Sequence, residues 1–275
     1  FIILFKMNKF NIYCLSLKEF TFFKYLPSNI IPIVLGSNLG SGKYLNDGVG
    51  DNMRNYNKFF GELTGMYWVY KNELKKYTKD DWIGICQYRR FFLDNTYDEF
   101  HKINTDLYSK LLFQKTSLFD TCDSVMIEPT YLKQNVYDHF RDNHGERIMK
   151  ESFKILDEKN SIQFKKYLEG NEFSICNMFI TKPEVFIRYC NFIFPFLQKI
   201  LSFCLKENLC VGPNIRLPVF FIERFTSFWF WKNTKVNYLS YAVLNKYFTS
   251  NIANIIYNTL KTPYSFKPYP TILKI

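Results

Sequence analysis

Short apolar runs alternate with longer segments of helical periodicity along most of this chain. One run, Trp82 to Cys86, contains no polar residue, as expected for a strand that is covered on both faces. The other strand-like runs are Phe10 to Ser16, Ile30 to Leu35, Ser124 to Ile127, Ser174 to Thr181 and Val236 to Tyr241. Helical spacing marks Met53 to Tyr77, Asn135 to Leu156, Pro183 to about Leu205, and Arg216 to Phe230. The alternation predicts an α/β fold with a mostly parallel central sheet flanked by helices.

The length of the chain fits one large domain. Its 275 residues can bury a substantial core, and neither an internal repeat nor a linker divides them. We expect the domain to span residues 8–275. Residues 1–7 would then form a disordered or artefactual N-terminus, because this apolar start is too short for a membrane span and lacks a signal-peptide cleavage site.

Several functional classes find no support in the motifs. No P-loop, G-x-S-x-G or Rossmann glycine pattern is present, which argues against NTPases, hydrolases and dinucleotide enzymes. The net charge of +11 favours anionic partners, but its lysines are scattered, so we expect no nucleic-acid partner. His139 and His144 lack metal-ligand spacing, and Asp80-Asp81 precedes its strand, where it suits a turn. The residues therefore predict no metal site.

The cysteines and the longest apolar segment bear on location. The seven cysteines form no CxxC pair and several lie in apolar runs, which predicts free buried thiols and a cytoplasmic protein. The segment Val185 to Leu205 is long and apolar, but Arg188 and Lys199 argue against a membrane span. We expect a core helix. The alternative is a helix that lies on the inner face of the cell membrane, where a lipid-linked acceptor would be found.

Polar residues at strand ends are the first candidates for a site, because ligands of open α/β sheets bind beyond the carboxyl ends of the strands. Tyr88, Arg89 and Arg90 directly follow the buried strand, and Asn177 falls inside another predicted strand. The two arginines either bind an anion such as phosphate or serve as one structural ion pair and one solvated side chain. The loop that ends at Asp51 and Asn52 leads into a helix N-terminus, which also favours an anion.

Glu223 and Arg224 form the second candidate, because they lie in a strongly apolar stretch. A carboxylate in such surroundings must be paired or have its pKa raised, and a raised pKa is how a general base is tuned. The alternative is an ion pair between the two side chains that holds a helix together.

The motifs also carry a family resemblance over roughly residues 10 to 240. The chain resembles the bacterial family catalogued as domain of unknown function 4422, whose members occur among capsule and exopolysaccharide synthesis proteins and are regarded as glycosyltransferases. The matching runs are GDNMRNYNKFFGELTGMYWVYKN, WIGICQYRRFF, NMFITKPEVFIRYCNFIFPFL and IERF. The resemblance implies a GT-A-like fold and a nucleotide-sugar donor, with transfer of galactose or galactofuranose. Carried onto this sequence, its motifs fall on Asp51, Asn52, Asn57, Glu62, Tyr88, Arg89, Arg90, Asn177, Glu223 and Arg224.

These residues suggest a mechanism for an inverting hexosyltransferase. Many GT-A enzymes hold a divalent metal with an Asp-x-Asp motif, and no such motif stands at a strand end here. Our hypothesis is that Arg89 and Arg90 neutralise the leaving diphosphate, with metal use left open, and that Glu223 deprotonates the acceptor hydroxyl. Asp51 and Asn52 would position the donor. The acceptor would be a saccharide or a lipid-linked sugar.

The sequence departs from the family at three places. Gln87 replaces the usual His before the Tyr-Arg-Arg motif, Leu17-Lys18 replaces an early His-Lys pair, and Val219 replaces a Gly. The alternative function is therefore a catalytically weakened relative that acts as a carbohydrate- or lipid-associated binding protein.

Overall fold

The computed structural model describes residues 8–36, 40–94 and 111–243. Residues 1–7 and 244–275 lie outside the described part, so the expected domain limits of 8 and 275 stay a prediction.

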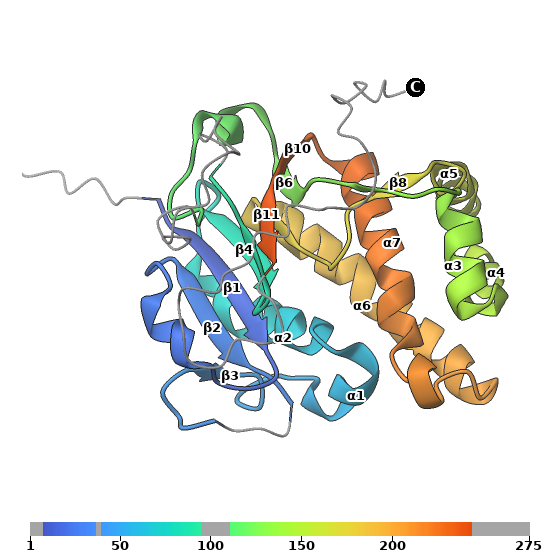
Figure 1. Cartoon of the computed structure of the whole chain (residues 1–275), viewed down its shortest axis with the longest axis horizontal. Coiled ribbons are helices and arrows are strands. Elements are labelled where there is room, and N and C mark those ends of the chain that lie inside the picture. Colours follow the sequence, from blue (N-terminus) through green and yellow to red (C-terminus); the bar gives the residue numbers. More distant parts are fainter. Residues whose placement is uncertain (1–7, 37–39, 95–110, 244–275) are drawn as a thin grey trace, which may run out of the picture.

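A twisted sheet forms the centre of the described structure, in the order β10-β6-β9-β4-β1-β2-β3 (Figure 1). Parallel pairing joins β1 to β2 and β4, β2 to β3, and β6 to β10, which confirms a mostly parallel sheet. Strand β9 is antiparallel to both of its neighbours, β4 and β6. The bounds are β1 (Phe10–Ser16), β2 (Ile30–Val34), β3 (Leu45–Asn46), β4 (Trp82–Gln87), β6 (Ser124–Ile127), β9 (Phe179–Thr181) and β10 (Val236–Leu239).

Two short additions extend the strand framework. Strand β5 (Arg90–Phe92) turns back from β4 and pairs with β11 (Tyr241–Val243). Strands β7 (Thr130–Tyr131) and β8 (Glu172–Phe173) form a separate antiparallel pair.

Helices cover one face of the sheet, and two of them carry most of the packing. Helix α6 (Pro183–Lys206) lies against the sheet and helix α7 (Leu217–Asn233) lies between the sheet and the group α3, α4 and α5 (Figure 1). That group comprises α3 (Val136–His144), α4 (Arg147–Ile155) and α5 (Glu158–Leu168), of which the sequence analysis missed α5. The remaining helical turns are η1 (Thr21–Tyr25), η2 (Arg54–Tyr56), α1 (Asn57–Phe60), α2 (Leu63–Trp68), η3 (Val69–Glu73), η4 (Leu74–Lys76), η6 (Ser117–Thr121) and η7 (Gly212–Asn214).

The strands place alternate side chains in two separate cores, because successive residues of a strand point to opposite faces. Tyr13 and Ile85 pack into the large core beneath the helices. Cys14 and Cys86, their neighbours in sequence, pack into a smaller core on the other face, with η1 and η6. Both faces of β4 are thus covered, as its unbroken apolar sequence predicted.

Three element predictions were wrong in detail. The helix expected from Met53 to Tyr77 is interrupted at Gly61, where φ is 49° and ψ is −127°. The helix expected from Asn135 to Leu156 breaks at Gly145, where φ is 78°. Glycine reaches such angles easily, whereas helical periodicity on both sides hides the break in the sequence. The run Ser174 to Thr181 is a strand only from Phe179, so Asn177 precedes strand β9.

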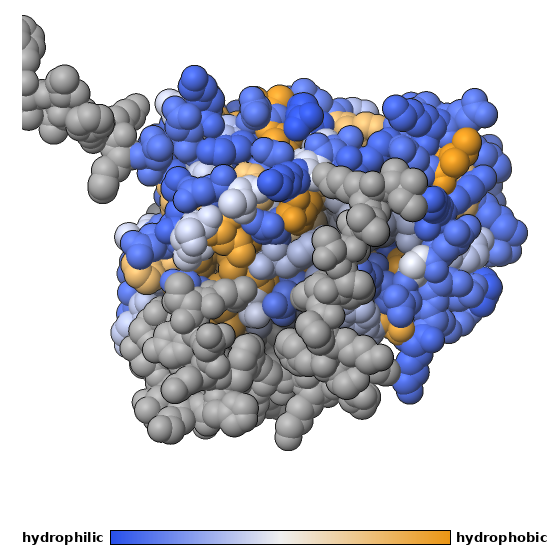
Figure 2. All heavy atoms as spheres, turned by 90° about the horizontal axis from the view of Figure 1, so that it is seen from above, coloured by the Kyte–Doolittle hydropathy of each residue, from blue (hydrophilic) through white to orange (hydrophobic). Residues whose placement is uncertain are grey.

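Helix α6 is a core helix, as expected, and it runs without a break through Pro195. Twelve of its side chains are buried, and among its large apolar side chains only Ile187 and Leu205 are exposed. Within the described residues no helix has the length and apolar character needed to cross a bilayer. The face of the molecule seen from above is mostly hydrophilic, with small separate apolar areas (Figure 2).

The seven cysteines are free, and all except the half-buried Cys122 are buried, which confirms the prediction of free thiols.

Candidate functional site

The antiparallel direction of β9 brings its start to the carboxyl ends of β4 and β6. Asn177 lies just before β9, and Gln87 is the last residue of β4. The side-chain amide of Gln87 donates a hydrogen bond from Nε2 to the backbone oxygen of Cys176, 2.8 Å away. Asn177 therefore does lie at the sheet edge where ligands bind in α/β folds, although not as a strand residue.

A tight hairpin separates the two adjacent arginines. Gln87 and Arg90 face each other across a turn formed by Tyr88 and Arg89, and Arg90 Nη1 donates to Gln87 Oε1 at 2.9 Å. The Arg89 guanidinium lies instead over the ring of Tyr88, at 5.2 Å, and this ring stacks on Phe20 at 4.9 Å. Of the two arginines, Arg90 is the one that is hydrogen-bonded to Gln87 and through it to the rest of the cluster.

Glu62 joins this cluster from the kink between α1 and α2. Its Oε1 accepts hydrogen bonds from Gln87 Nε2 at 3.2 Å and from Asn177 Nδ2 at 3.1 Å. Burial raises the pKa of the carboxyl, and the Asn177 hydrogen bond and the charges of Arg216 and Arg90 oppose that rise. The two amides donate to the same oxygen and so stabilise the ionised form of the carboxyl against the effect of burial.

A buried hydrogen-bond network supports the kink that presents Glu62. Asn57 Nδ2 donates to the backbone oxygen of Gly61 at 2.9 Å and to Thr64 Oγ1 at 3.0 Å. Thr64 in turn donates to Asp47 Oδ2 at 2.8 Å, and Asp47 Oδ1 accepts from the backbone of Gly36 at 2.9 Å. The Nδ2 of Asn57 thus helps to fix the turn before Glu62, and its expected part in donor binding stays a prediction.

Asp51 and Asn52 are exposed on the loop before η2. Tyr67 donates from its hydroxyl to Asp51 Oδ1 at 3.1 Å, and Asn52 Oδ1 accepts from the backbone of Arg54 at 3.2 Å. In the portion of the chain that the structure describes, no hydrogen bond links either residue to Glu62. Their predicted part in donor binding stays a prediction.

The second carboxylate, Glu223, lies on α7 with 20% of its side chain exposed. Burial raises its pKa to about 7, the neighbouring Arg224 opposes the rise, and the charge of Glu62 adds to it. The Nη1 of Arg224 lies 3.4 Å from Glu223 Oε2, so the ion pair considered as an alternative is present. A pKa near 7 nevertheless gives Glu223 the property of a general base.

The guanidinium of Arg224, the residue after Glu223, packs against two aromatic rings. It is 4.6 Å from the centroid of the Phe173 ring and 5.3 Å from that of Phe140, and Nη1 donates to the backbone oxygen of Phe220 at 2.7 Å. The side chain is 6% exposed. Arg224 is thus enclosed by aromatic rings and backbone, and its expected catalytic part stays a prediction.

A strained turn lies between the two carboxylates. Cys176 and Asn177 have φ angles of 76° and 50°, in the left-handed region that few residues with a side chain adopt. Thr226 fixes the turn by donating to Asn177 Oδ1 at 2.8 Å, and Tyr189 lies 2.6 Å from the same threonine hydroxyl. Strain of this kind persists where the surrounding structure enforces it, commonly at functional sites.

Sequence reasoning missed two members of the site, Thr226 and Arg216. Thr226 follows Glu223 by three residues on a helix, so both lie on one face. This spacing of polar residues in an apolar helix was the available signal. Arg216 precedes the helix and gave no signal of its own.

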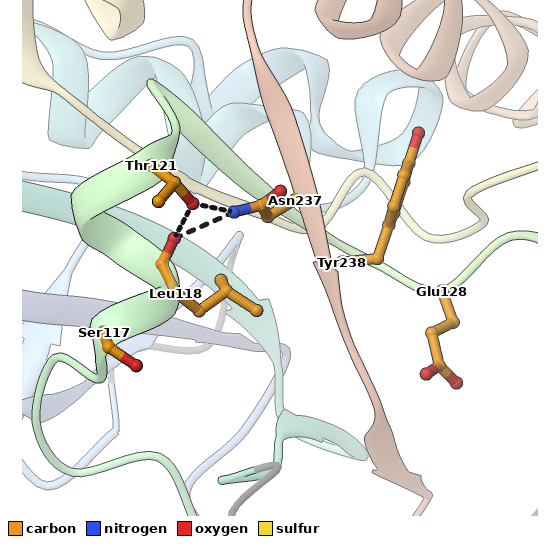
Figure 3. Close-up of a pocket in the computed structure, with 6 residues that line it drawn as sticks. All are labelled: Ser117, Leu118, Thr121, Glu128, Asn237 and Tyr238. Carbon is orange, nitrogen blue, oxygen red and sulfur yellow. Dashed lines mark hydrogen bonds between the residues drawn. The ribbon is translucent and has the colours of Figure 1, made fainter. Parts of the chain in front are cut away.

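A separate pocket of about 500 Å³ lies beside β10 (Figure 3) and contains none of the predicted site residues. Asn237 Nδ2 donates to Leu118 O at 2.8 Å and to Thr121 Oγ1 at 3.0 Å, so its amide is used within the protein. The pocket is lined by Ser117, Leu118, Thr121, Glu128, Asn237 and Tyr238.

Comparison with known proteins identifies the family. The family described as Domain of unknown function (DUF4422) matches residues 11–225. The chain belongs to this family. No curated protein matches the chain.

One solved structure shows that this DUF4422 chain has the fold expected from the resemblance. The apo structure of WbbM, a bifunctional glycosyltransferase, superposes with a TM-score of 0.65 at 21% identity. The match covers 88% of this chain and 48% of WbbM, so the chain spans about half the length of that protein. The GT-A-like architecture is thereby shown, while the activity of WbbM remains a property of WbbM.

The kink at Gly61 can be tested by placing a side chain on it. We expect Gly61→Ala to lower the free energy of unfolding by about 1–3 kcal/mol, because alanine is strained at these angles. The relaxed backbone should also move Glu62 away and lower the pKa of Glu223, measured by carbon-13 NMR of labelled glutamate. The matched control is Gly145→Ala, which removes a similar helix break: it should lose stability and leave the Glu223 titration at about 7. An unchanged titration in Gly61→Ala would contradict the role given to the kink.

Burial of Glu223 predicts a pH-dependent stability penalty. Because its pKa is raised from 4.5 to about 7, the folded state retains a proton that the unfolded state releases, so stability falls as pH rises through this window. Glu223→Gln should therefore gain stability relative to the wild type between pH 4.5 and pH 8, by up to about 3 kcal/mol, measured by urea unfolding.

The exposed Glu146 supplies the control of opposite sign, because Lys150 lowers its pKa. Glu146→Gln should lose a little stability at pH 8 and nothing at low pH. Equal pH dependence of wild type and Glu223→Gln would show that Glu223 is not the titrating group.

Proposed function

We propose that this chain is a glycosyltransferase that moves a hexose, galactose or galactofuranose, from a nucleoside-diphosphate sugar to a saccharide or lipid-linked acceptor in bacterial cell-surface polysaccharide synthesis. The observation that carries the proposal is a carboxylic acid with a pKa near 7, Glu223, in the same cluster as Arg90 and Glu62 at the ligand-binding edge of the sheet. The likeness in fold to a glycosyltransferase supports it.

Each group supplies one part of an inverting transfer. Glu223 accepts the proton of the acceptor hydroxyl while that oxygen forms its bond to the anomeric carbon of the donor. The bond from the anomeric carbon to the diphosphate breaks at the same time, and its electron pair leaves with the diphosphate. Arg90 stabilises the charge that develops there. Glu62, held ionised by its two amide partners, accepts hydrogen bonds from sugar hydroxyls.

The residues also indicate how the leaving group is neutralised. Arg90 belongs to the hairpin that directly follows β4, and its Nε is buried without a hydrogen-bond partner in the described structure. The outer N–H groups of Arg90 that are not used on Gln87 suit a phosphate oxygen, because the planar guanidinium presents several donors. Arg89, at the tip of the same hairpin, would contribute more weakly. Within the described residues, no group of three or more His, Cys, Asp or Glu side chains could hold a metal ion. A divalent ion carried by the donor itself is compatible with this proposal.

The proposed location of the enzyme in the cell depends on its acceptor. Free thiols suit a cytoplasmic enzyme, and a lipid-linked acceptor would bring it to the inner face of the membrane. The competing proposal is that the chain is a weakened relative that binds carbohydrate without transferring it. The reason for this alternative is that Gln87 replaces the family's usual His. Transfer from a panel of radiolabelled nucleotide sugars separates the two functions, since the binding protein would release no nucleoside diphosphate.

The arginines provide the first quantitative test. We expect Arg90→Met to lower kcat/KM at least 100-fold, the scale of losing one oxyanion-type donor, and Arg89→Met to lower it less than 10-fold. Both variants are assayed with Mn²⁺, with Mg²⁺ and with EDTA. Strict metal dependence with unchanged donor binding in Arg90→Met would sink the phosphate-binding role.

The two carboxylates provide the second test. Activity should rise with pH through about 7, because Glu223 acts in its deprotonated form. Glu62→Gln keeps an oxygen for the amide donors but removes the charge that raises the pKa of Glu223. The acidic limb of the kcat/KM profile should therefore move to lower pH. Glu223→Gln should lose the limb together with most of the activity. A limb that stays in place in Glu62→Gln would contradict the coupling between the two carboxylates.

A further inference from the structure

Arg216 is a second arginine whose charge acts on the carboxyl of Glu62, beside that of Arg90. It is the residue immediately before α7, the helix that carries Glu223, and it is half-buried. Its guanidinium packs over the kink: a Cβ added to Gly61 would lie 3.7 Å from Arg216 Nη1. The guanidinium of Arg216 therefore lies within van der Waals range of the residue that precedes Glu62.

Glu62 is shared by the two arginines without a direct ion pair to either. The charges of both Arg216 and Arg90 act on its carboxyl. Among the ion pairs of the described residues none includes Glu62, Arg90 or Arg216. Arg90 makes no ion pair with Glu62 because the side-chain amide of Gln87 lies between them and hydrogen-bonds to both.

The two guanidinium groups therefore keep unused donors. Arg90 donates from Nη1 to Gln87, and its Nη2 forms no hydrogen bond within the described residues. For Arg216 the described part of the chain supplies no side-chain hydrogen bond or ion pair. The two arginines are cations, and burial raises the pKa of both nearby carboxyls, Glu62 and Glu223, which favours a local excess of positive charge.

We propose that Arg216 and Arg90 together bind the diphosphate of the donor, next to Glu62, on whose carboxyl the charges of both arginines act. This inference rests on the proposed function and adds a residue that neither the motifs nor the resemblance indicated. Two arginines from separate parts of the chain can each bind one phosphate of a diphosphate, because a guanidinium presents several N–H donors in one plane.

The experiment uses inorganic pyrophosphate, which carries the phosphates without base or sugar, and measures its binding to the full chain by isothermal titration calorimetry. We expect Arg216→Met to weaken binding 10- to 100-fold and Arg216→Lys to recover part of the loss, because lysine keeps the charge but not the fork. The matched control is Arg188→Met, which removes an exposed arginine on α6. It should bind as the wild type does.

A double-mutant cycle of Arg216→Met and Arg90→Met distinguishes one shared ligand from two independent sites. If the ligand is shared, the fold loss of pyrophosphate affinity in the double variant should be smaller than the product of the two single losses. Thermal unfolding verifies that each variant is folded. Wild-type affinity in Arg216→Met, or no binding of pyrophosphate to the wild type, overturns the inference. The proposed function fails by a different result, the absence of sugar transfer by the wild type with every donor tested.

Discussion

The carboxylate of Glu62 is the charge around which this edge of the sheet is arranged. A buried carboxylate is unfavourable unless hydrogen-bond donors replace the lost water. Here the donors are two side-chain amides, Gln87 at the end of β4 and Asn177 before β9. Bringing both to one oxygen requires the antiparallel β9, the turn at Cys176 and the kink at Gly61. Three separate parts of the chain therefore depend on a single acceptor atom.

This arrangement is unfavourable for stability in itself. Two consecutive residues with left-handed backbone angles, and a second buried carboxylate whose pKa is raised to about 7, both favour unfolding at neutral pH. The large core beneath the helices offsets the strain. Thr226 and Tyr189, which fix the turn, belong to helices α7 and α6 of that core. The packing of these helices thus determines the geometry of the site as well as the stability of the fold.

The sequence predicted the structure correctly where the residues of a single strand or helix were sufficient to determine it. The apolar run Trp82 to Cys86 predicted a strand covered on both faces, and the polar residues after it were placed at the correct edge of the sheet. The sequence-based prediction failed where contacts between distant parts of the chain determine the local structure. Helical periodicity on both sides of Gly61 concealed a break that exists because Asn57, Thr64 and Asp47 stabilise it. The sequence could not tell which of Arg89 and Arg90 joins the cluster, because the hairpin decides it, and Arg216 is related to the site only through the folded position of Gly61 and Glu62.

The replacement of the family's usual histidine by Gln87 affects how the charge of the site depends on pH. A histidine at this position would titrate near neutral pH and change the charge between Glu62 and Arg90. Glutamine has no charge to change, and it satisfies an anion and a cation at once through its two amide ends. Burial and the charge of Arg224 both lower the pKa of His139, which favours its neutral imidazole. Glu223, whose pKa is raised to about 7, supplies the change of charge near neutral pH that a general base requires.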